Sequence, residues 1–498
     1  MSGAAWWHGG EPWLVLLLVI PLAGALLCFA HANWARAVAL GAATLTAVAA
    51  VFLSAAVART GSVAYAVGAW PAPLGIQWHV DPLGVWMLLL SAAVGWAGVV
   101  YALGYYSPRG EHTAGSRQAR FFWPLWLFLW ASLNAMFMSA DLFNLYLALE
   151  LTGLAAVGLT ALPGVDQALR AAMRYFLASL LGSLAYLLGV ALLYGRYGVL
   201  DIGLLGERFV LDWPGVLAAA LITLALLLKS AIFPLHFWLP AAHGRAPTPV
   251  SAVLSAVVVA ATFYLLVRLW FGPLDALLRT PAANLLGALG AVAIVWGAMQ
   301  ALRQRRLKML IAYSTVSQLG YGMLLFPLAA AGAEAGLAWS GALLVVFAHG
   351  LAKAGLFFAA GCIALHYGHD RIERLLGMWG SVAWAWLAFA LASASLVGLP
   401  PSGGFAGKWL MLQAAIATEA WLWAGVIVAG TLLTALYLFR ILERALRPGP
   451  RVREVRPLPA PMLALAVIPA AGAFLLGLFM APLGDLLTLD APYGSGGP

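Results

Sequence analysis

Charged residues and cysteines are both scarce in this chain. Asp, Glu, Lys and Arg make up 9% of the 498 residues, far below the roughly 25% of a typical soluble domain, and the mean hydropathy is +0.94. This shortage excludes an ordinary soluble protein. The two cysteines, Cys28 and Cys362, lie in separate apolar segments and fit no disulfide or metal pattern. We expect both to be packing residues.

Signatures of redox, nucleotide and metal chemistry are also missing. The sequence has no cysteine cluster for an iron–sulfur centre, no GxGxxG after a strand and no P-loop. We therefore predict no cofactor, no metal, and no redox or hydrolytic site within this chain. Whether it serves a larger enzyme stays open. The net charge of +9 does not indicate nucleic-acid binding, because the arginines are spread over separate short loops.

Apolar stretches of about 20 residues recur along the whole chain, and each is long enough to cross a bilayer. We predict an all-α integral membrane protein with about 14 transmembrane helices. The expected spans are 13–30, 34–58, 82–104, 121–139, 141–162, 171–195, 214–239, 247–271, 284–302, 307–328, 338–366, 383–418 (interrupted), 421–442 and 459–480. The connections are too short for a soluble domain.

The distribution of basic residues predicts the orientation. Connections after odd-numbered spans carry nineteen Lys and Arg residues, and those after even-numbered spans carry five. Because basic loops stay in the cytoplasm, both termini should face the non-cytoplasmic side. Lys308 opens the span 307–328 beside three of these arginines, and we interpret it mainly as a cytoplasmic anchor, with access to an ion path as the alternative.

Lysine is rare, and its placement is unusual. Only four of the twenty-seven basic residues are lysines, and three of them, Lys229, Lys353 and Lys408, lie deep inside apolar runs. Arginine holds its proton in proteins, whereas a buried lysine can release one. Ionisable groups at membrane depth are costly and suggest an ion or proton path by default.

Glu150 is the clearest carboxylate at membrane depth, and Lys229 is its expected partner. Glu150 lies well inside span 141–162, and Lys229 comes shortly before Pro234 in span 214–239. A cationic partner lets a buried carboxylate stay charged. We expect a switchable ion pair in which separation helps Lys229 to release its proton. A purely structural pair is the alternative.

Two further lysines and three histidines extend the predicted path. His349 and Lys353 are four residues apart and share one helix face, which favours a proton relay over a packing histidine. Lys408 follows a Pro/Gly-rich break and is expected to end the path, with a structural cap as the alternative. His236 and His243 flank Pro240 and either lead protons toward one surface or bond to backbone at the interface.

Two of the spans are broken, and this suggests an internal repeat. Prolines interrupt the sequence after Lys229, while Pro400, Pro401, Gly403 and Gly404 interrupt it before Lys408. Paired broken helices indicate inverted repeats around an ion site. We predict N-terminal helices 1–3 in 1–120, two inverted five-helix repeats in 121–271 and 284–445 with discontinuous helices 7 and 12, and a last helix in 459–480.

The motifs around these residues resemble the antiporter-like membrane subunits of respiratory complex I, membrane-bound hydrogenases and Mrp-type cation/proton antiporters. They are KSAIFPLHFWLPAAHGRAPTPVSAVLS, LKMLIAYSTVSQLGYG, HGLAKAGLFF and GLPPSGGFAGKW. The D-type Mrp subunit and its complex I counterparts look closest. The resemblance implies a fourteen-helix fold, partner membrane subunits in a bacterial or archaeal cell membrane, and a proton path through Glu150, Lys229, Lys353, His349 and Lys408.

One departure from the family pattern concerns the eighth span. Relatives usually carry a lysine after the PVSA motif, and this chain has Ala260 there. Water or hydroxyl groups, such as those of Ser255 and Thr262, would have to bridge the gap between Lys229 and His349. The departure leaves open whether the proton path is continuous.

Several functions fit this pattern. Na⁺/H⁺ exchange of the Mrp type is the first assignment, and proton pumping in complex I or a membrane-bound hydrogenase is the second. A membrane partner in inorganic-carbon uptake is a third. A scaffold with a closed channel belongs to a different class. The sequence shows no Na⁺ cage, so the transported cation is not determined.

Overall fold

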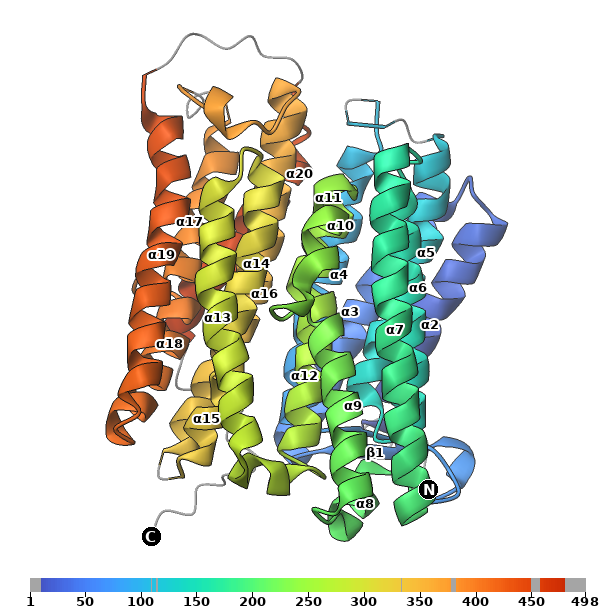
Figure 1. The fold of residues 1–498 in the computed structure, drawn as a ribbon. Helices are drawn as coiled ribbons and strands as arrows, with labels where there is room; N and C mark the ends of the chain where they lie inside the picture. The colour runs from blue at the N-terminus through green and yellow to red at the C-terminus, as the bar shows by residue number, and fades with distance from the viewer. Residues whose placement is uncertain are drawn as a thin grey trace.

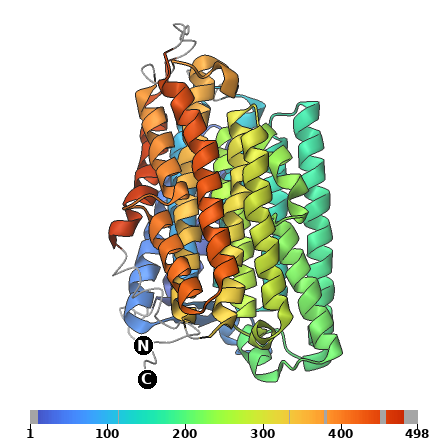
Figure 2. The ribbon, with the colours of Figure 1, turned by 60° about the vertical axis from the view of Figure 1, so that its left-hand side comes forward.

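The computed structural model describes residues 10–108, 110–112, 115–332, 334–377, 382–448 and 457–479. The long helices run side by side in one bundle (Figures 1 and 2). Among the described residues, 12 helices are long and apolar enough to cross a membrane. They are α2 (Glu11–Ala30), α3 (Ala35–Thr60), α4 (Pro82–Tyr105), α5 (Arg117–Met138), α6 (Leu142–Ala161), α7 (Asp166–Tyr197), α11–η3–α12 (Thr248–Trp270), α13 (Pro281–Arg303), α14–α15 (Leu307–Ala330), α16 (Ala335–Tyr367), α19 (Trp421–Leu446) and α20–η6 (Ala460–Phe479).

Shorter helices complete the bundle. They are α8 (Ile202–Arg208), α9 (Trp213–Lys229), η2 (Leu235–Trp238), α10 (Leu239–Arg245), η4 (Asp275–Arg279), η5 (Ile372–Arg374), α17 (Ala383–Val397) and α18 (Gly403–Ala417). The predicted all-α membrane fold is confirmed. The predicted total of about 14 spans and the division into inverted repeats stay predictions.

Both predicted breaks occur. Helix α9 ends at Lys229, and the helix resumes only at η2 and α10. Helix α17 ends at Val397, Gly398 takes a left-handed conformation with φ of 90°, and α18 starts after Ser402, whose hydroxyl accepts a hydrogen bond from Phe405 N–H at 3.1 Å. One detail of the prediction is wrong. Gly403 and Gly404 lie in the first turn of α18, because the Ser402 cap starts the helix before them.

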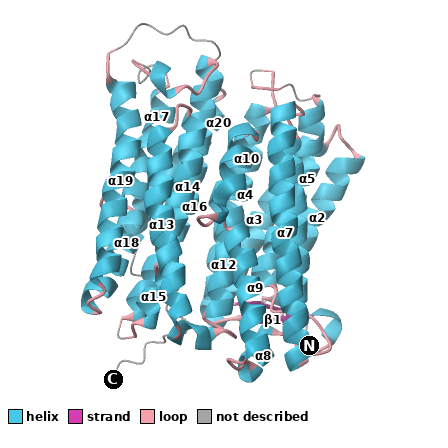
Figure 3. Ribbon diagram, in the orientation of Figure 1, coloured by secondary structure: helices cyan, strands magenta, loops and turns pink. Residues whose placement is uncertain are grey.

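A small hairpin was not predicted. Strands β1 (Val63–Ala66) and β2 (Gln77–Val80) pair in antiparallel register within the connection between α3 and α4 (Figure 3). Trp78 of β2 also bridges to Ser139, just before α6. The hairpin therefore ties the starts of α4 and α6 together at one end of the bundle. Its strands are only four residues each, too short to give a clear alternating pattern.

Helix α16 and the α11–η3–α12 span form the centre of the bundle. Both are almost wholly buried among the other helices. Around this centre, small residues let helices approach closely, as is usual in membranes. Between α13 and α14, a Cβ at Gly290 would come within 2.6 Å of the Gly320 carbonyl oxygen. The central position of α16 keeps His349 and Lys353 away from the lipid-facing surface.

An ion pair holds the hairpin end of the bundle. Arg268 of α12 donates to both carboxylate oxygens of Asp81, at 3.0 and 2.9 Å, and Asp81 also caps α4 by accepting from Gly84 N–H. Burial acts to raise the pKa of Asp81, but the Arg268 guanidinium and the Gly84 N–H outweigh it and lower that pKa. The pair thus contributes stability above the ordinary aspartate pKa and loses it as the pH falls through the lowered value.

We predict that Asp81→Asn destabilises the protein by about 2–3 kcal/mol, because it leaves the buried Arg268 charge without a counter-charge while asparagine keeps the helix cap. The loss should appear as a lower thermal midpoint of the purified protein at neutral pH. Asp212→Asn is the matched control, since Asp212 also caps a helix and pairs with the more exposed Arg196. Equal effects of the two substitutions would contradict this prediction.

Candidate functional site

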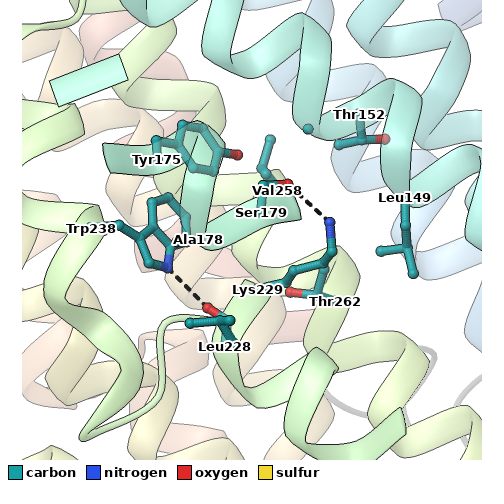
Figure 4. A pocket seen from close by; sticks show the side chains of 11 residues that line it. Leu149, Thr152, Tyr175, Ala178, Ser179, Leu228, Lys229, Trp238, Val258 and Thr262 are labelled. Atoms are coloured by element: carbon teal, nitrogen blue, oxygen red, sulfur yellow. Dashed lines mark hydrogen bonds between the residues drawn. The ribbon is translucent and has the colours of Figure 1, made fainter. Parts of the chain in front are cut away.

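Lys229 lies at the end of α9 and faces a small cavity. Its ammonium donates a hydrogen bond to Ser179 Oγ of α7 at 3.0 Å (Figure 4). The cavity measures about 20 Å³, which is large enough to hold one water molecule. Tyr175 and Trp238 form one wall, with their rings stacked 4.2 Å apart. The site therefore combines a buried amine, hydroxyl groups and room for water.

Glu150 is half-buried on α6, and the structure does not join it directly to Lys229. Among the described residues, the two side chains form no close ion pair, although the carboxylate still acts electrostatically on the amine. Ser179 takes the hydrogen bond instead. Gly153 makes room for this arrangement, because a Cβ there would come within 2.5 Å of Ser179 Oγ. The expected pair is thus separated in this structure.

Two pairs of hydroxyl groups flank the position of Ala260. Next to Lys229, Ser230 Oγ and Thr262 Oγ1 lie 2.8 Å apart. Ser255 Oγ and Thr315 Oγ1 lie 2.7 Å apart on the other side. Ser255 and Thr262 are seven residues apart, which corresponds to roughly 10 Å along a helix. Each of the two predicted bridging residues therefore contacts another hydroxyl group. About two helical turns of apolar residues separate Ser255 from Thr262.

Lys353 is fully buried on α16 and is bound by α14. Its Nζ donates to the Ile311 carbonyl oxygen at 3.0 Å and to Ser314 Oγ. His349 lies one turn earlier on the same helix, and neither of its ring nitrogens has a hydrogen-bond partner among the described residues. Its electrostatic neighbours include both Lys353 and Lys408. The relay stays a prediction: His349 lies one helical turn from Lys353 and is affected by the charges of both lysines.

Lys408 binds the carbonyl groups at the end of α17. Its Nζ donates to Leu396 O at 2.7 Å and to Val397 O at 3.3 Å, and it lies 4.3 Å from the centroid of the Tyr321 ring. The contacts with the helix end are those of the structural cap that the sequence left open as an alternative. A role in ion transfer stays a prediction, because a capping amine can still exchange its proton.

The remaining predicted residues lie at different depths. His243 is fully buried, stacks on Phe357 of α16 at 4.9 Å, and interacts electrostatically with Lys353 and Lys308. Lys308 donates to the Ala246 carbonyl oxygen at 3.2 Å, so it ties α14 to the end of α10. His243 is therefore placed between the central lysine and the end of the bundle where Lys308 lies.

His236 does not share this position. It is only partly buried in η2 and accepts a hydrogen bond from Trp296 Nε1 of α13 at 3.3 Å. Among the described residues, no hydrogen bond or ring contact joins it to His243. The two histidines thus do not form one direct relay in this structure.

Sequence reasoning missed the polar face of α14. Ser314, Gln318 and Tyr321 recur at helical spacing, and this face contacts Lys353 through Ser314 and Lys408 through Tyr321. Gln318 also donates to Thr434 of α19 at 3.1 Å. The spacing i, i+4, i+7 within an apolar span was the available signal. This spacing would have predicted a polar face on the helix that contacts Lys353 and Lys408.

Carboxylates are not gathered around these amines. Among the described residues, no group of three or more His, Cys, Asp or Glu side chains is arranged to hold a metal ion. Each of the three buried lysines instead donates to hydroxyl or carbonyl oxygens. These hydrogen bonds of the amines are therefore with neutral oxygens, and among the described residues the Glu150 carboxylate acts on Lys229 without a direct contact.

Comparison with known proteins confirms the family resemblance. Residues 139–434 match the family described as NADH:quinone oxidoreductase/Mrp antiporter, transmembrane. The chain is 36% identical over 495 residues to NADH-quinone oxidoreductase subunit N of Desulforudis audaxviator (strain MP104C), covering 93% of this chain and 95% of that protein. It is 28% identical over 398 residues to the D subunit of the Na(+)/H(+) antiporter of Alkalihalophilus pseudofirmus, covering 78% of this chain and 77% of that protein.

The fold of this chain also matches a solved structure. A chain in the solved structure of the Mrp complex from Dietzia sp. DQ12-45-1b superimposes with a TM-score of 0.87 at 24% identity, over 96% of each chain. The sequence match covers more than half of this chain, and the similarity to subunit N extends over nearly all of it. The chain belongs to the NADH:quinone oxidoreductase/Mrp antiporter family of membrane proteins.

Proposed function

We propose that this chain is the proton- or cation-translocating subunit of a multisubunit membrane complex, with Na⁺/H⁺ exchange as the first assignment. The observation that supports this most strongly is the set of three buried lysines, which donate to neutral oxygens. Charges at membrane depth without an opposite charge in contact destabilise a fold. Apolar residues at these positions would pack better than lysines, so a functional requirement explains why the lysines are present.

The proposed mechanism uses the alternative partners of Lys229. When its ammonium turns from Ser179 to Glu150, the negative charge favours the protonated amine. When it returns to Ser179, the proton is easier to release to water in the cavity. Ser230 and Thr262 then offer hydroxyl groups toward the central helices. Proton transfer past Ala260 would require water between the two hydroxyl pairs.

The wider setting follows from the relatives. Proteins similar to this chain carry names of subunits of multisubunit complexes, and this supports partner membrane subunits for the chain. The predicted location is the cell membrane of a bacterium or archaeon, with both termini on the non-cytoplasmic side. Protons, and Na⁺ in the first assignment, would be the transported ions.

Proton pumping driven by a redox partner is the second candidate. The 36% identity to the N subunit of a quinone oxidoreductase exceeds the 28% identity to the D subunit of an antiporter, and this favours it. Separate measurements of Na⁺ and H⁺ flux in vesicles with the complete complex distinguish the two. Obligatory exchange of both ions supports antiport, whereas H⁺ flux that needs an electron donor supports the redox pump.

Removing either member of the proposed pair should stop transport. We predict that Glu150→Gln and Lys229→Ala each lower ion flux by roughly a hundredfold, since each removes a proton-transferring group, while the complex still assembles. The measurement is flux in vesicles, with subunit content checked on the same sample. Glu207→Gln, at an exposed glutamate of α8, should leave flux unchanged. Normal flux in both site variants would rule out the ion-pair mechanism.

The space beside Lys229 can be tested without touching its charge. Gly153→Ala places a methyl group within 2.5 Å of Ser179 Oγ, so we predict a marked loss of flux as the hydroxyl is displaced. Gly195→Ala in α7 is the matched control, because a Cβ there meets nothing within 4 Å. Both variants should assemble. If Gly153→Ala transports as fast as Gly195→Ala, the Ser179 contact is not part of the path.

The contact between the hydroxyl groups of Ser230 and Thr262 gives a third test. Thr262→Val keeps the side-chain shape but removes the contact with Ser230, so we expect flux to fall several-fold. Thr46→Val is the control, since the Thr46 hydroxyl is buried and bonds only within its own helix. Flux is compared at equal amounts of assembled complex. Equal rates in the two variants would show that protons do not pass through Thr262.

A further inference from the structure

A groove of about 370 Å³ opens between α7, α10 and the start of α14. It lies at the end of the bundle that the distribution of basic residues assigns to the cytoplasm. Four arginines line it, namely Arg170 and Arg174 of α7, Arg245 at the end of α10 and Arg306 before α14. They come from three separate segments, so the folded bundle brings their charges together.

Most of this positive charge is not neutralised within the chain. Arg306 faces Asp370 at 3.4 Å. Arg170, Arg174 and Arg245 are exposed and form no ion pair among the described residues. Asp166 lies one turn before Arg170 on α7, but it makes no close ion pair within the described part of the chain. The groove therefore attracts an anion.

An apolar surface continues from the groove along α7. Leu177 and Leu181 follow Arg174 at three and seven residues, so they share its helix face. Their exposed fractions are 57% and 62%. A ligand that fits both features has an anionic head and an apolar tail. A free inorganic anion would use only the groove.

We propose that the groove binds the phosphate of an anionic phospholipid, with an acyl chain along Leu177 and Leu181. Arginine forks match phosphate oxygens in pairs, and basic pockets between membrane helices on the cytoplasmic side suit lipid headgroups. The residues that line the groove are neighbours in sequence of residues that line the Lys229 cavity. Tyr175 follows Arg174 on α7, and Trp238 precedes α10.

The test uses the complete complex in phosphatidylcholine vesicles that contain a minor fraction of phosphatidylglycerol with a photoreactive acyl chain. After illumination, mass spectrometry measures labelling of the α7 segment that contains Leu177 and Leu181. We expect Arg170→Gln with Arg174→Gln to lower this labelling roughly 25-fold, from about 1 kcal/mol for each arginine near the surface. Arg245→Gln, on the other wall, should lower it by roughly fivefold.

Controls separate the possible ligands. Arg444→Gln with Arg447→Gln removes the same charge from the C-terminal end of α19 and the residue that follows it, outside the groove, and should leave α7 labelling unchanged. Photoreactive phosphatidylcholine should label α7 only weakly. Displacement of the labelled lipid by inorganic phosphate at constant ionic strength would overturn the proposal in favour of a free anion. Equal labelling by both lipids, together with loss of a neighbouring subunit from the α7 double variant, would assign the groove to a protein contact.

Discussion

The burial of three lysine ammonium groups without a contacting carboxylate is the constraint on which the rest of the structure depends. Each amine must receive acceptors from the protein, because lipid supplies none. Ser179 supplies one for Lys229, α14 supplies those of Lys353, and the open end of α17 supplies those of Lys408. The break after α17 therefore supplies hydrogen-bond acceptors for the Lys408 ammonium. If α17 continued, its carbonyl groups at that depth would be bonded within the helix.

The two ends of the bundle have different chemistry. At the hairpin end, the aspartates Asp81, Asp141 and Asp212 cap α4, α6 and α9. At the other end, arginines gather around the starts of α7 and α14. The orientation predicted from the loops stays a prediction, and it would place the capping aspartates on the non-cytoplasmic side. The basic groove and the Lys229 cavity are both lined by residues of α7, so this helix connects the membrane surface with the interior of the bundle.

Much of the fold was predictable because its signals are local. Apolar runs defined the spans, and Pro234 and Pro400 indicated the breaks. The site was predictable only in part. Lys229, Lys353 and Lys408 stand out as charges among apolar residues, but serine is common in such helices, so Ser179 gave no comparable signal. Its contact with Lys229 depends on how α7 and α9 pack, which spacing along one helix cannot reveal.

Replacing Lys353 with arginine in the complete complex, and measuring proton flux in vesicles, tests the central claim most directly. Arginine keeps the positive charge but does not release its proton in proteins. If the buried lysines transfer protons, the Lys353→Arg variant should assemble and yet transport as poorly as Lys353→Ala. If Lys353→Arg transports at the rate of the unmodified complex, the lysine acts only as a fixed charge, and proton transfer through the buried lysines is contradicted.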